Sequence, residues 1–174
     1  QAETIEALGG SLRAIAEAGQ GSLRDALSIL DQAITFGGGK LGETEVEQLL
    51  GRLDRRFYHE LLRAALEGAP AEIVRAVAAV ADAGADVRSV YRDLGRYARG
   101  LLLLRAAPGI ALPEGLAGAD LGAMSALALG RSYEELLRLY DLLLREEGFV
   151  RRSEDPQLSF ELVLLKAAEL RKLR

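Results

Sequence analysis

The stretch GSLRDALSILDQAI, at positions 21–34, places an arginine and an aspartate in the first turn of a predicted amphipathic helix. Ser22 at the N-cap and Asp25 at the third helical position predict a capping box that satisfies two free backbone amides. Arg24 has no such structural role. An exposed cation at the positive end of the helix dipole is unfavourable by about 0.3 to 1 kcal/mol unless an anion lies close to it. The spacing therefore indicates either a phosphate beside Arg24 or a simple ion pair with Asp25, Glu17 or a solvent-exposed neighbour.

Other catalytic chemistry has few candidate residues. The chain has no cysteine and one histidine, His59, which excludes disulfides, thiolate metal sites and histidine-based metal clusters or catalytic triads. We interpret His59 as a surface or hydrogen-bonded histidine rather than a ligand. The sequence GGGK (37–40) is the only near match to a phosphate-binding loop, but it follows a helix and continues with Leu41 where a hydroxyl is required. We therefore predict no catalytic residue, cofactor or metal within this chain.

Composition sets the class of protein. The 174 residues are 49% hydrophobic, which is enough for one core, or for one domain and part of a neighbour. The net charge of -4 argues against a dedicated nucleic-acid surface, which usually has an excess of basic residues. No uncharged apolar run is long enough to span a membrane, and the N-terminus has no signal sequence. Because the first residue is Gln1, we expect the chain to be a piece of a longer protein.

Apolar residues recur at spacings of three and four along the whole chain, which predicts an all-α fold of about seven to nine helices. One early helix begins at Gly10. The later predicted helices begin near Ser22, Thr44, Asp54, Pro70, Asp86, Asp120, Ser132 and Asp155 and end near Gly37, Gly51, Gly68, Gly84, Ala106, Leu129, Gly148 and Leu173. The run of glycines at 37–39 is the strongest candidate for a domain boundary, and 107–122 is the longest predicted loop.

The last predicted helix is apolar around most of its circumference, from Leu158 to Leu173. Such a helix is buried on more than one side, either at the centre of a monomeric bundle or between its own domain and a neighbouring subunit. Glu161 lies within this apolar belt, and a lone buried carboxylate is strongly unfavourable, so we expect it to meet an arginine or a backbone amide. Leu162 and Leu165 are our candidates for outward-facing residues in a subunit contact. Glu161 is a candidate for fixing the register of the helix or for a subunit contact.

A basic row follows one face of the helix predicted at 86–106, with spacings of four, four and three: Arg88, Arg92, Arg96 and Arg99. One interpretation is a solvated face with Asp93 alongside. The others are a contact with an acidic patch on a neighbouring subunit, for which Arg88, Arg92 and Arg96 are candidates, and a contact with DNA phosphates. Arg151 and Arg152 have the same alternatives.

The stretch GSLRDALSILDQAI strongly resembles the sensor-two segment in the lid domain of the gamma/tau family, the AAA+ motor subunits of the bacterial DNA polymerase III clamp loader. The segments ETEVEQLLG, ADAGADVRSVYRDL and PQLSFELVLLKAAEL are similar to parts of the family's collar domain. The resemblance is dense over 12–51 and 151–170 and loose over 107–130. It implies the end of an AAA+ lid at 1–39, with two helices, followed by a helical collar bundle at 40–174.

The resemblance also implies function. Arg24 matches the arginine that contacts the phosphates of ATP, so ATP and magnesium would bind in the full-length parent, an ATPase subunit. This fragment lacks the phosphate-binding loop and the magnesium motif, so it would not itself be an enzyme. The collar would hold the loader ring together for ATP-dependent clamp loading in DNA replication. Implied partners are copies of the chain and the delta and delta-prime subunits, with the sliding clamp and primer-template DNA reached through the parent, all in the cytoplasm.

Two other functions stay open at this point. One is a stand-alone α-helical DNA-binding module that uses the arginine row as its contact face. The other is the helical C-terminal region of a different replication-associated AAA+ protein. Salt dependence separates DNA binding from collar packing, because phosphate-driven binding weakens steeply between about 50 and 200 mM salt whereas apolar packing does not.

Overall fold

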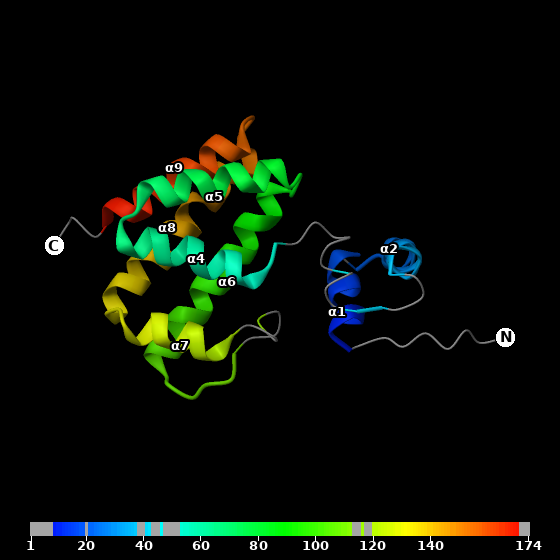
Figure 1. Cartoon of the computed structure of the whole chain (residues 1–174), viewed down its shortest axis with the longest axis horizontal. Coiled ribbons are helices and arrows are strands. Elements are labelled where there is room, and N and C mark those ends of the chain that lie inside the picture. The colour runs from blue at the N-terminus through cyan, green and yellow to red at the C-terminus, as the bar shows by residue number, and fades with distance from the viewer. Residues whose placement is uncertain are drawn as a thin grey trace. The chain divides into compact units, whose positions relative to one another are not determined.

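The chain folds into helices, as the computed structural model shows (Figure 1). The structure describes residues 9–19, 21–37, 41–42, 46, 53–112, 116 and 120–170. Eight helices lie in these ranges: α1 (Gly9–Ala18), α2 (Leu23–Phe36), α4 (Arg55–Glu67), α5 (Pro70–Asp82), α6 (Val87–Ala106), α7 (Leu121–Leu129), α8 (Tyr133–Arg152) and α9 (Pro156–Glu169). The all-α prediction is confirmed. None of the helices in these ranges is both long and apolar enough to cross a bilayer.

The chain divides into two compact units, Gln1–Leu53 and Asp54–Arg174. The first unit contains α1 and α2, and its buried core consists of four described residues, Ile15, Ala33, Leu41 and Val46. The Ser11 hydroxyl is buried and donates a hydrogen bond to the Leu41 carbonyl at 2.9 Å, which ties the segment after α2 back to α1. The domain boundary predicted between residues 39 and 40 stays a prediction.

A close approach between α1 and α2 fixes where α2 begins. A Cβ atom on Gly19 would lie 2.8 Å from the Cβ of Ala26, nearer than real side chains come. Any larger residue at position 19 would therefore push the end of α1 away from the second turn of α2.

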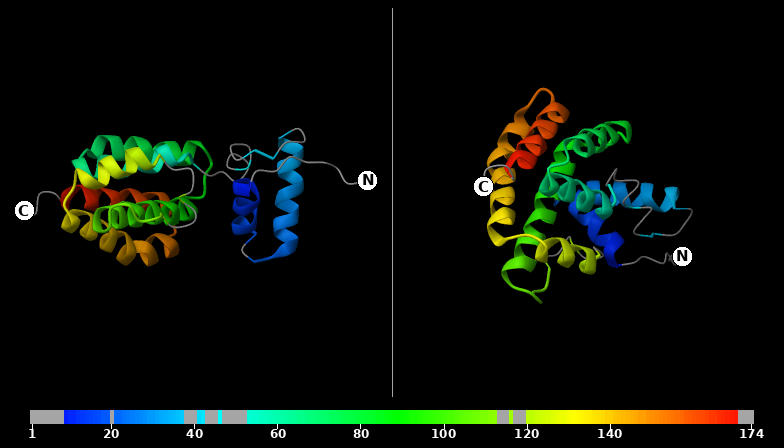
Figure 2. Two further views of the ribbon diagram at one scale, coloured as in Figure 1. Left: turned by 90° about the horizontal axis from the view of Figure 1, so that it is seen from below. Right: turned by 60° about the vertical axis from the view of Figure 1, so that its left-hand side comes forward.

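The second unit is a bundle in which α6 and α9 occupy the centre. Helix α9 packs against α4, α5, α6 and α8, and α6 packs against α4, α7, α8 and α9. Figure 2 shows α6, α8 and α9 grouped in this way from two further directions. The rings of Tyr91 and Phe160 meet edge to face with centroids 5.8 Å apart, joining the two central helices. The remaining buried side chains of α9 are Ser159, Val163, Leu164, Ala167 and Ala168.

Helix α7 packs closely on α6 because α6 carries a glycine at the contact. A Cβ on Gly100 would lie 2.6 Å from Cδ1 of Leu116 and 2.9 Å from Cε of Met124. Leu116 and Met124 are both buried. The glycine therefore creates the space into which these two side chains fit.

The predicted N-caps of the bundle are confirmed by their hydrogen bonds. Ser132 and Glu135 form a full capping box at the start of α8. Aspartate side chains accept hydrogen bonds from first-turn amides at the starts of four further helices: Asp54, Asp86, Asp120 and Asp155. These bonds involve only residues two or three positions apart, so the sequence alone is sufficient to predict them.

One predicted helix end is wrong. Helix α8 continues through Gly148 to Arg152 instead of ending at the glycine. The side chain of Val150 is buried, and the Arg88 guanidinium donates hydrogen bonds to the carbonyls of Arg151, at 3.0 Å, and Ser153, at 3.2 Å. Contacts from α6 therefore stabilise the extra turn by satisfying carbonyls that the helix end leaves free.

Other predicted features fall partly outside the described residues. Helix α2 ends next to Gly37 as predicted, although that glycine has φ -82° and is not left-handed. The helix predicted from Thr44 to Gly51 lies on residues outside the described set, apart from Val46. The same applies to most of the GGGK stretch and to the end of the last helix beyond Leu170.

Candidate functional site

The start of α2 carries the first candidate residue. Ser22 has extended backbone angles, φ -87° and ψ 111°, and its hydroxyl accepts a hydrogen bond from the Asp25 amide at 3.3 Å. The Ser22 amide donates to the carbonyl of Gly19 at 2.8 Å. The predicted capping box is therefore only half formed, because the backbone turn after α1 already satisfies the amide that Asp25 was expected to bind.

Arg24 is exposed, and its guanidinium forms no ion pair with Asp25 or with any other residue that the structure describes. Leu23 and Leu27 lie beside it on the same helix and are 75% and 51% exposed. The helix thus presents a cation and two apolar side chains to solvent at its N-terminal end. Such a surface can bind an anion. The polar side chains described beside Arg24 are the Asp25 carboxylate and the hydroxyls of Ser22 and Ser28, and both hydroxyls form hydrogen bonds within the helix.

The arginine row of α6 does not act as one surface. Arg88 is used to stabilise the end of α8, as described above, and Arg96 pairs with Asp93 at 3.1 Å. Arg92 and Arg99 are exposed and have no ion pair within the described ranges. Arg96 thus has Asp93 beside it, as the solvated-face interpretation expected, and Arg88 has a structural role that helical spacing did not reveal.

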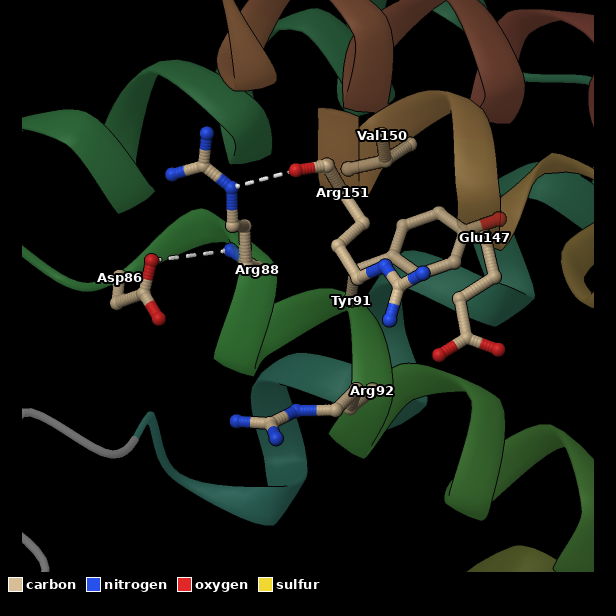
Figure 3. Close-up of a pocket in the computed structure, with 7 residues that line it drawn as sticks. All are labelled: Asp86, Arg88, Tyr91, Arg92, Glu147, Val150 and Arg151. Atoms are coloured by element: carbon tan, nitrogen blue, oxygen red, sulfur yellow. Dashed lines mark hydrogen bonds between the residues drawn. The ribbon is translucent and has the colours of Figure 1, made fainter. Parts of the chain in front are cut away.

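A cavity of about 210 Å³ lies between the start of α6 and the last turns of α8 (Figure 3). Its floor includes Tyr91, whose hydroxyl donates a hydrogen bond to the Leu143 carbonyl at 2.7 Å. Burial raises the pKa of Tyr91 well above its usual range, and the charges of Glu146 and Glu147 add to this shift, so the phenol stays neutral. The lining residues are Asp86, Arg88, Tyr91, Arg92, Glu147, Val150 and Arg151.

The outer side of α9 is the second candidate surface. Leu158 is 62% exposed and Leu162 is 43% exposed, while Leu165 is half-buried. Glu161 is also half-buried, and it forms no ion pair within the described part of the chain. The expectation that Glu161 is buried against an arginine or an amide is therefore wrong, because the buried arc of α9 lies on the far side of the helix and water reaches the carboxylate.

His59 has a hydrogen-bonding partner, as predicted. Its Nδ1 atom lies 3.1 Å from the Tyr97 hydroxyl. Burial, together with the charges of Asp120 and Glu60, raises the pKa of Tyr97 to about 12. No three His, Asp or Glu side chains in the described residues are arranged to hold a metal ion.

One surface was not predicted from the sequence. Helix α8 carries an apolar row made of the exposed Tyr133, Leu137 and Leu144 and the half-buried Tyr140, in addition to its buried Leu136, Leu139 and Leu143. The sequence analysis predicted the helix and its capping box but did not separate these two sets. The spacing of the exposed row, four, three and four, is the signal that could have found it.

Comparison with known proteins agrees with this architecture. The family described as DNA polymerase III subunits gamma and tau domain III matches residues 41–174. The family described as DNA polymerase III clamp loader subunit, ATPase lid domain, matches residues 1–39. The two families therefore meet close to the glycine run that follows α2.

Individual relatives carry the same name. DNA polymerase III subunit tau of Bacillus subtilis is 24% identical over 177 residues, which cover 97% of this chain and 30% of that protein. The Escherichia coli tau subunit is 27% identical over 157 residues, 90% of this chain and 24% of that protein. The tau/gamma subunit of Haemophilus influenzae is 39% identical over 72 residues, 41% of this chain and 10% of that protein.

The chain thus spans less than a third of the length of these relatives. The domain III family covers most of its residues, including every helix of the bundle. The remaining N-terminal residues, with α1 and α2, match the lid of a clamp-loader ATPase. This chain therefore belongs to the gamma and tau subunit family of DNA polymerase III, the clamp-loader subunits.

Proposed function

We propose that the bundle formed by Asp54–Arg174 is the collar through which clamp-loader subunits associate into a ring. The observation that carries this proposal is the position of α9. This helix packs against four other helices and is buried along one arc, yet its opposite side leaves Leu158 and Leu162 open to solvent. A central helix that still exposes a leucine row is suited to bury that row against another subunit.

Under this proposal, association is driven mainly by burial of apolar area rather than by charge. In the complete loader we propose that the neighbours are copies of this chain and the delta and delta-prime subunits. The sliding clamp and primer-template DNA would be reached through the remainder of the parent protein. DNA binding by the bundle itself has less support, because Arg88 and Arg96 are engaged within the unit and the chain's net charge is -4.

We further propose that Arg24 contacts the phosphates of ATP in the full-length subunit. An exposed guanidinium without an ion pair in the described residues, in the first turn of a helix, is free to pair with a phosphate. The parent would then be the ATPase, while this chain supplies one contact to the nucleotide and none of the phosphate-binding loop or magnesium chemistry.

Sedimentation velocity tests the assembly role. The wild-type chain at tens of micromolar should form complexes larger than a monomer, alone or with the partner loader subunits. Leu162→Asp should weaken association at least about thirtyfold, because it places a charge in an apolar contact. Leu129→Asp is the matched control, since Leu129 is 59% exposed at the end of α7, outside α9. A wild-type chain that stays monomeric in both settings would contradict the proposal.

A further inference from the structure

The cavity between the start of α6 and the last turns of α8 takes no part in the functions proposed above (Figure 3). Neither Arg24 nor the exposed leucines of α9 line it. Its volume of about 210 Å³ would hold about seven water molecules, at roughly 30 Å³ each. Pockets for drug-sized ligands are larger, about 300 to 1,000 Å³. The cavity therefore has the size of a site for a small organic molecule.

The charges around the cavity are unbalanced. Three arginines and two carboxylates line it, which gives a net charge of +1 in a chain whose net charge is -4. One of the carboxylates, Asp86, caps α6, and its two oxygens accept hydrogen bonds from the amides of Arg88 and Ser89, each at 3.2 Å. The other, Glu147, is exposed and forms no ion pair within the described part of the chain. The arginines of the cavity are thus not neutralised by either carboxylate.

Two of these arginines can bind an anion from two different helices. Arg92 belongs to α6 and Arg151 to α8, and neither has an ion pair among the residues described. The third, Arg88, is held by the carbonyls of Arg151 and Ser153, which fix its orientation without cancelling its charge. A guanidinium presents paired N–H donors that match the two oxygens of a carboxylate. The cavity therefore favours an anionic ligand.

The floor of the cavity is apolar and firmly held. Val150 and Tyr91 are both buried. The Tyr91 hydroxyl donates to the Leu143 carbonyl at 2.7 Å, and its ring packs edge to face on Phe160, so the ring is the part of Tyr91 that can contact a ligand. Figure 3 shows the Arg151 side chain alongside this ring. The floor thus suits a ligand with an apolar body, which a bare inorganic ion does not have.

The two carboxylates beside the cavity discriminate between kinds of anion. A phosphate monoester carries about -1.5 to -2 charges at pH 7 and would be repelled by Asp86 and Glu147 more strongly than a carboxylate would. The single charge of a carboxylate matches the net charge of +1. We propose that this cavity binds a small organic monocarboxylate, with the carboxylate between Arg92 and Arg151 and the apolar body against Tyr91. This inference is independent of the assembly role and of Arg24.

An occupied cavity would stabilise the connection between α8 and α9. Helix α8 ends at Arg152 and α9 begins at Pro156. A ligand held by Arg92 and Arg151 would join α6 to the last turn of α8, in addition to the hydrogen bonds from Arg88. A ligand that binds only the folded state raises its stability. Hydrogen exchange at residues 147–153 should therefore slow when the site is filled.

Benzoate is a suitable probe, because it joins one carboxylate to one ring. We expect calorimetry on the whole chain to give a dissociation constant of about 0.1 to 1 mM, a normal affinity for so small a ligand. Acetate and inorganic phosphate lack the ring, and benzyl alcohol lacks the charge. Each of the three should bind at least about tenfold more weakly, and none should slow hydrogen exchange at 147–153 as benzoate does.

Four variants test the assigned residues. Arg92→Gln and Arg151→Gln should each weaken benzoate binding at least about tenfold, because each removes a charge-assisted hydrogen bond. Glu147→Gln should strengthen it about two- to fivefold by removing a like charge. Arg99→Gln is the matched control, since Arg99 is an exposed arginine of α6 that does not line the cavity. All four side chains are exposed, so circular dichroism should show wild-type helicity in every variant.

Three results would overturn the proposal. Benzoate that binds no better than acetate or benzyl alcohol would show that the charge and the ring are not recognised together. Inorganic phosphate that binds more tightly than benzoate would assign the arginines to a phosphate. Equal losses in Arg92→Gln and Arg99→Gln would show a general effect of charge on α6. Sedimentation of the wild-type chain without benzoate tests the assembly role separately, so either proposal can fail while the other stands.

Discussion

The buried side chains that the structure describes are unequally distributed between the two compact units. In Asp54–Arg174, α9 contacts four other helices and Phe160 is completely buried. In Gln1–Leu53, the buried core that the structure describes has only four residues, and Leu23 and Leu27 of α2 are largely exposed. A small unit buries a smaller fraction of its surface and is correspondingly less stable.

The two proposed functions, nucleotide contact and subunit assembly, lie on different units. Arg24, the proposed nucleotide contact, lies on the unit with the smaller described core. The proposed assembly surface lies on α9, whose position is fixed by its contacts with four other helices. We expect the first unit to respond to ligands and the second to hold its shape, and four experiments sharpen or break this comparison.

Loss of a central ring should have the largest effect. Phe160→Ala leaves a cavity and removes the contact with Tyr91, so it should lower the free energy of unfolding of the bundle by about 3 to 5 kcal/mol. Leu158→Ala, at an exposed position of the same helix, should change it by less than about 0.5 kcal/mol. Urea denaturation measures the change in the free energy of unfolding for both variants. Hydrogen exchange then shows which of the two units loses protection. Simultaneous loss of protection in α1 and α2 would show that the units are not independent.

Arg24→Ala should act on nucleotide binding and not on folding. In the full-length subunit we expect ATP affinity to fall about ten- to a hundredfold, as one charge-assisted hydrogen bond of about 1.5 to 3 kcal/mol is lost. Helicity by circular dichroism should be unchanged, and Arg24→Lys should recover only part of the affinity because an ammonium lacks the guanidinium fork. The isolated chain should show no ATP binding by calorimetry. Micromolar binding there, or lost helicity with normal ATPase activity, would contradict the assigned role.

Ser11→Ala should destabilise the first unit alone. It removes the donor to the Leu41 carbonyl and leaves that buried oxygen unpaired, which should lower the unit's free energy of unfolding by about 1 to 2 kcal/mol. Because the unit starts from a small core, faster hydrogen exchange in α1 and α2 should be measurable while the bundle is unchanged. Equal protection in the variant and the wild type would show that the Ser11–Leu41 bond contributes little.

Alkaline pH should produce the smallest effect, and only in the bundle. The pKa of Tyr97 is raised to about 12 in the folded state, whereas an unfolded tyrosine titrates near pH 10. The neutral phenol is therefore favoured by folding, so this contribution is complete below about pH 10 and is lost as the pH rises toward 12. Urea unfolding at pH 9 and 11 should show a smaller alkaline loss in Tyr97→Phe than in the wild type. An identical loss in both would assign the alkaline slope to other groups.

Local features of the fold could be predicted because the residues involved are neighbours in the chain. The capping box of Ser132 and Glu135 depends only on residues three positions apart, and Asp86 caps α6 through amides within its own first turn. The exposure of Arg24 followed from the same kind of local argument. The capping box predicted from Ser22 and Asp25 formed only in part, because the Ser22 amide already donates to the Gly19 carbonyl.

Features that depend on distant contacts could not be predicted. The glycine at position 148 should end a helix by its own preference, but Arg88 supports α8 from a position 63 residues before Arg151. Glu161 was expected to be buried because α9 is apolar almost all round, and sequence alone does not say which arc of such a helix the neighbours cover. The apolar row of α8 that begins at Tyr133 was missed for the same reason.

The segment that follows α2 also affects how this protein could be divided or recombined. Leu41 and Val46 belong to the domain III match, yet both are buried in the core of the first unit with Ile15 and Ala33. A crossover between homologues at residue 40 would therefore combine half of that core from each parent. A crossover at residues 53–54 would transfer each hydrophobic core intact. Chimaeras of lids and collars from different bacteria should consequently tolerate the later junction better than the earlier one.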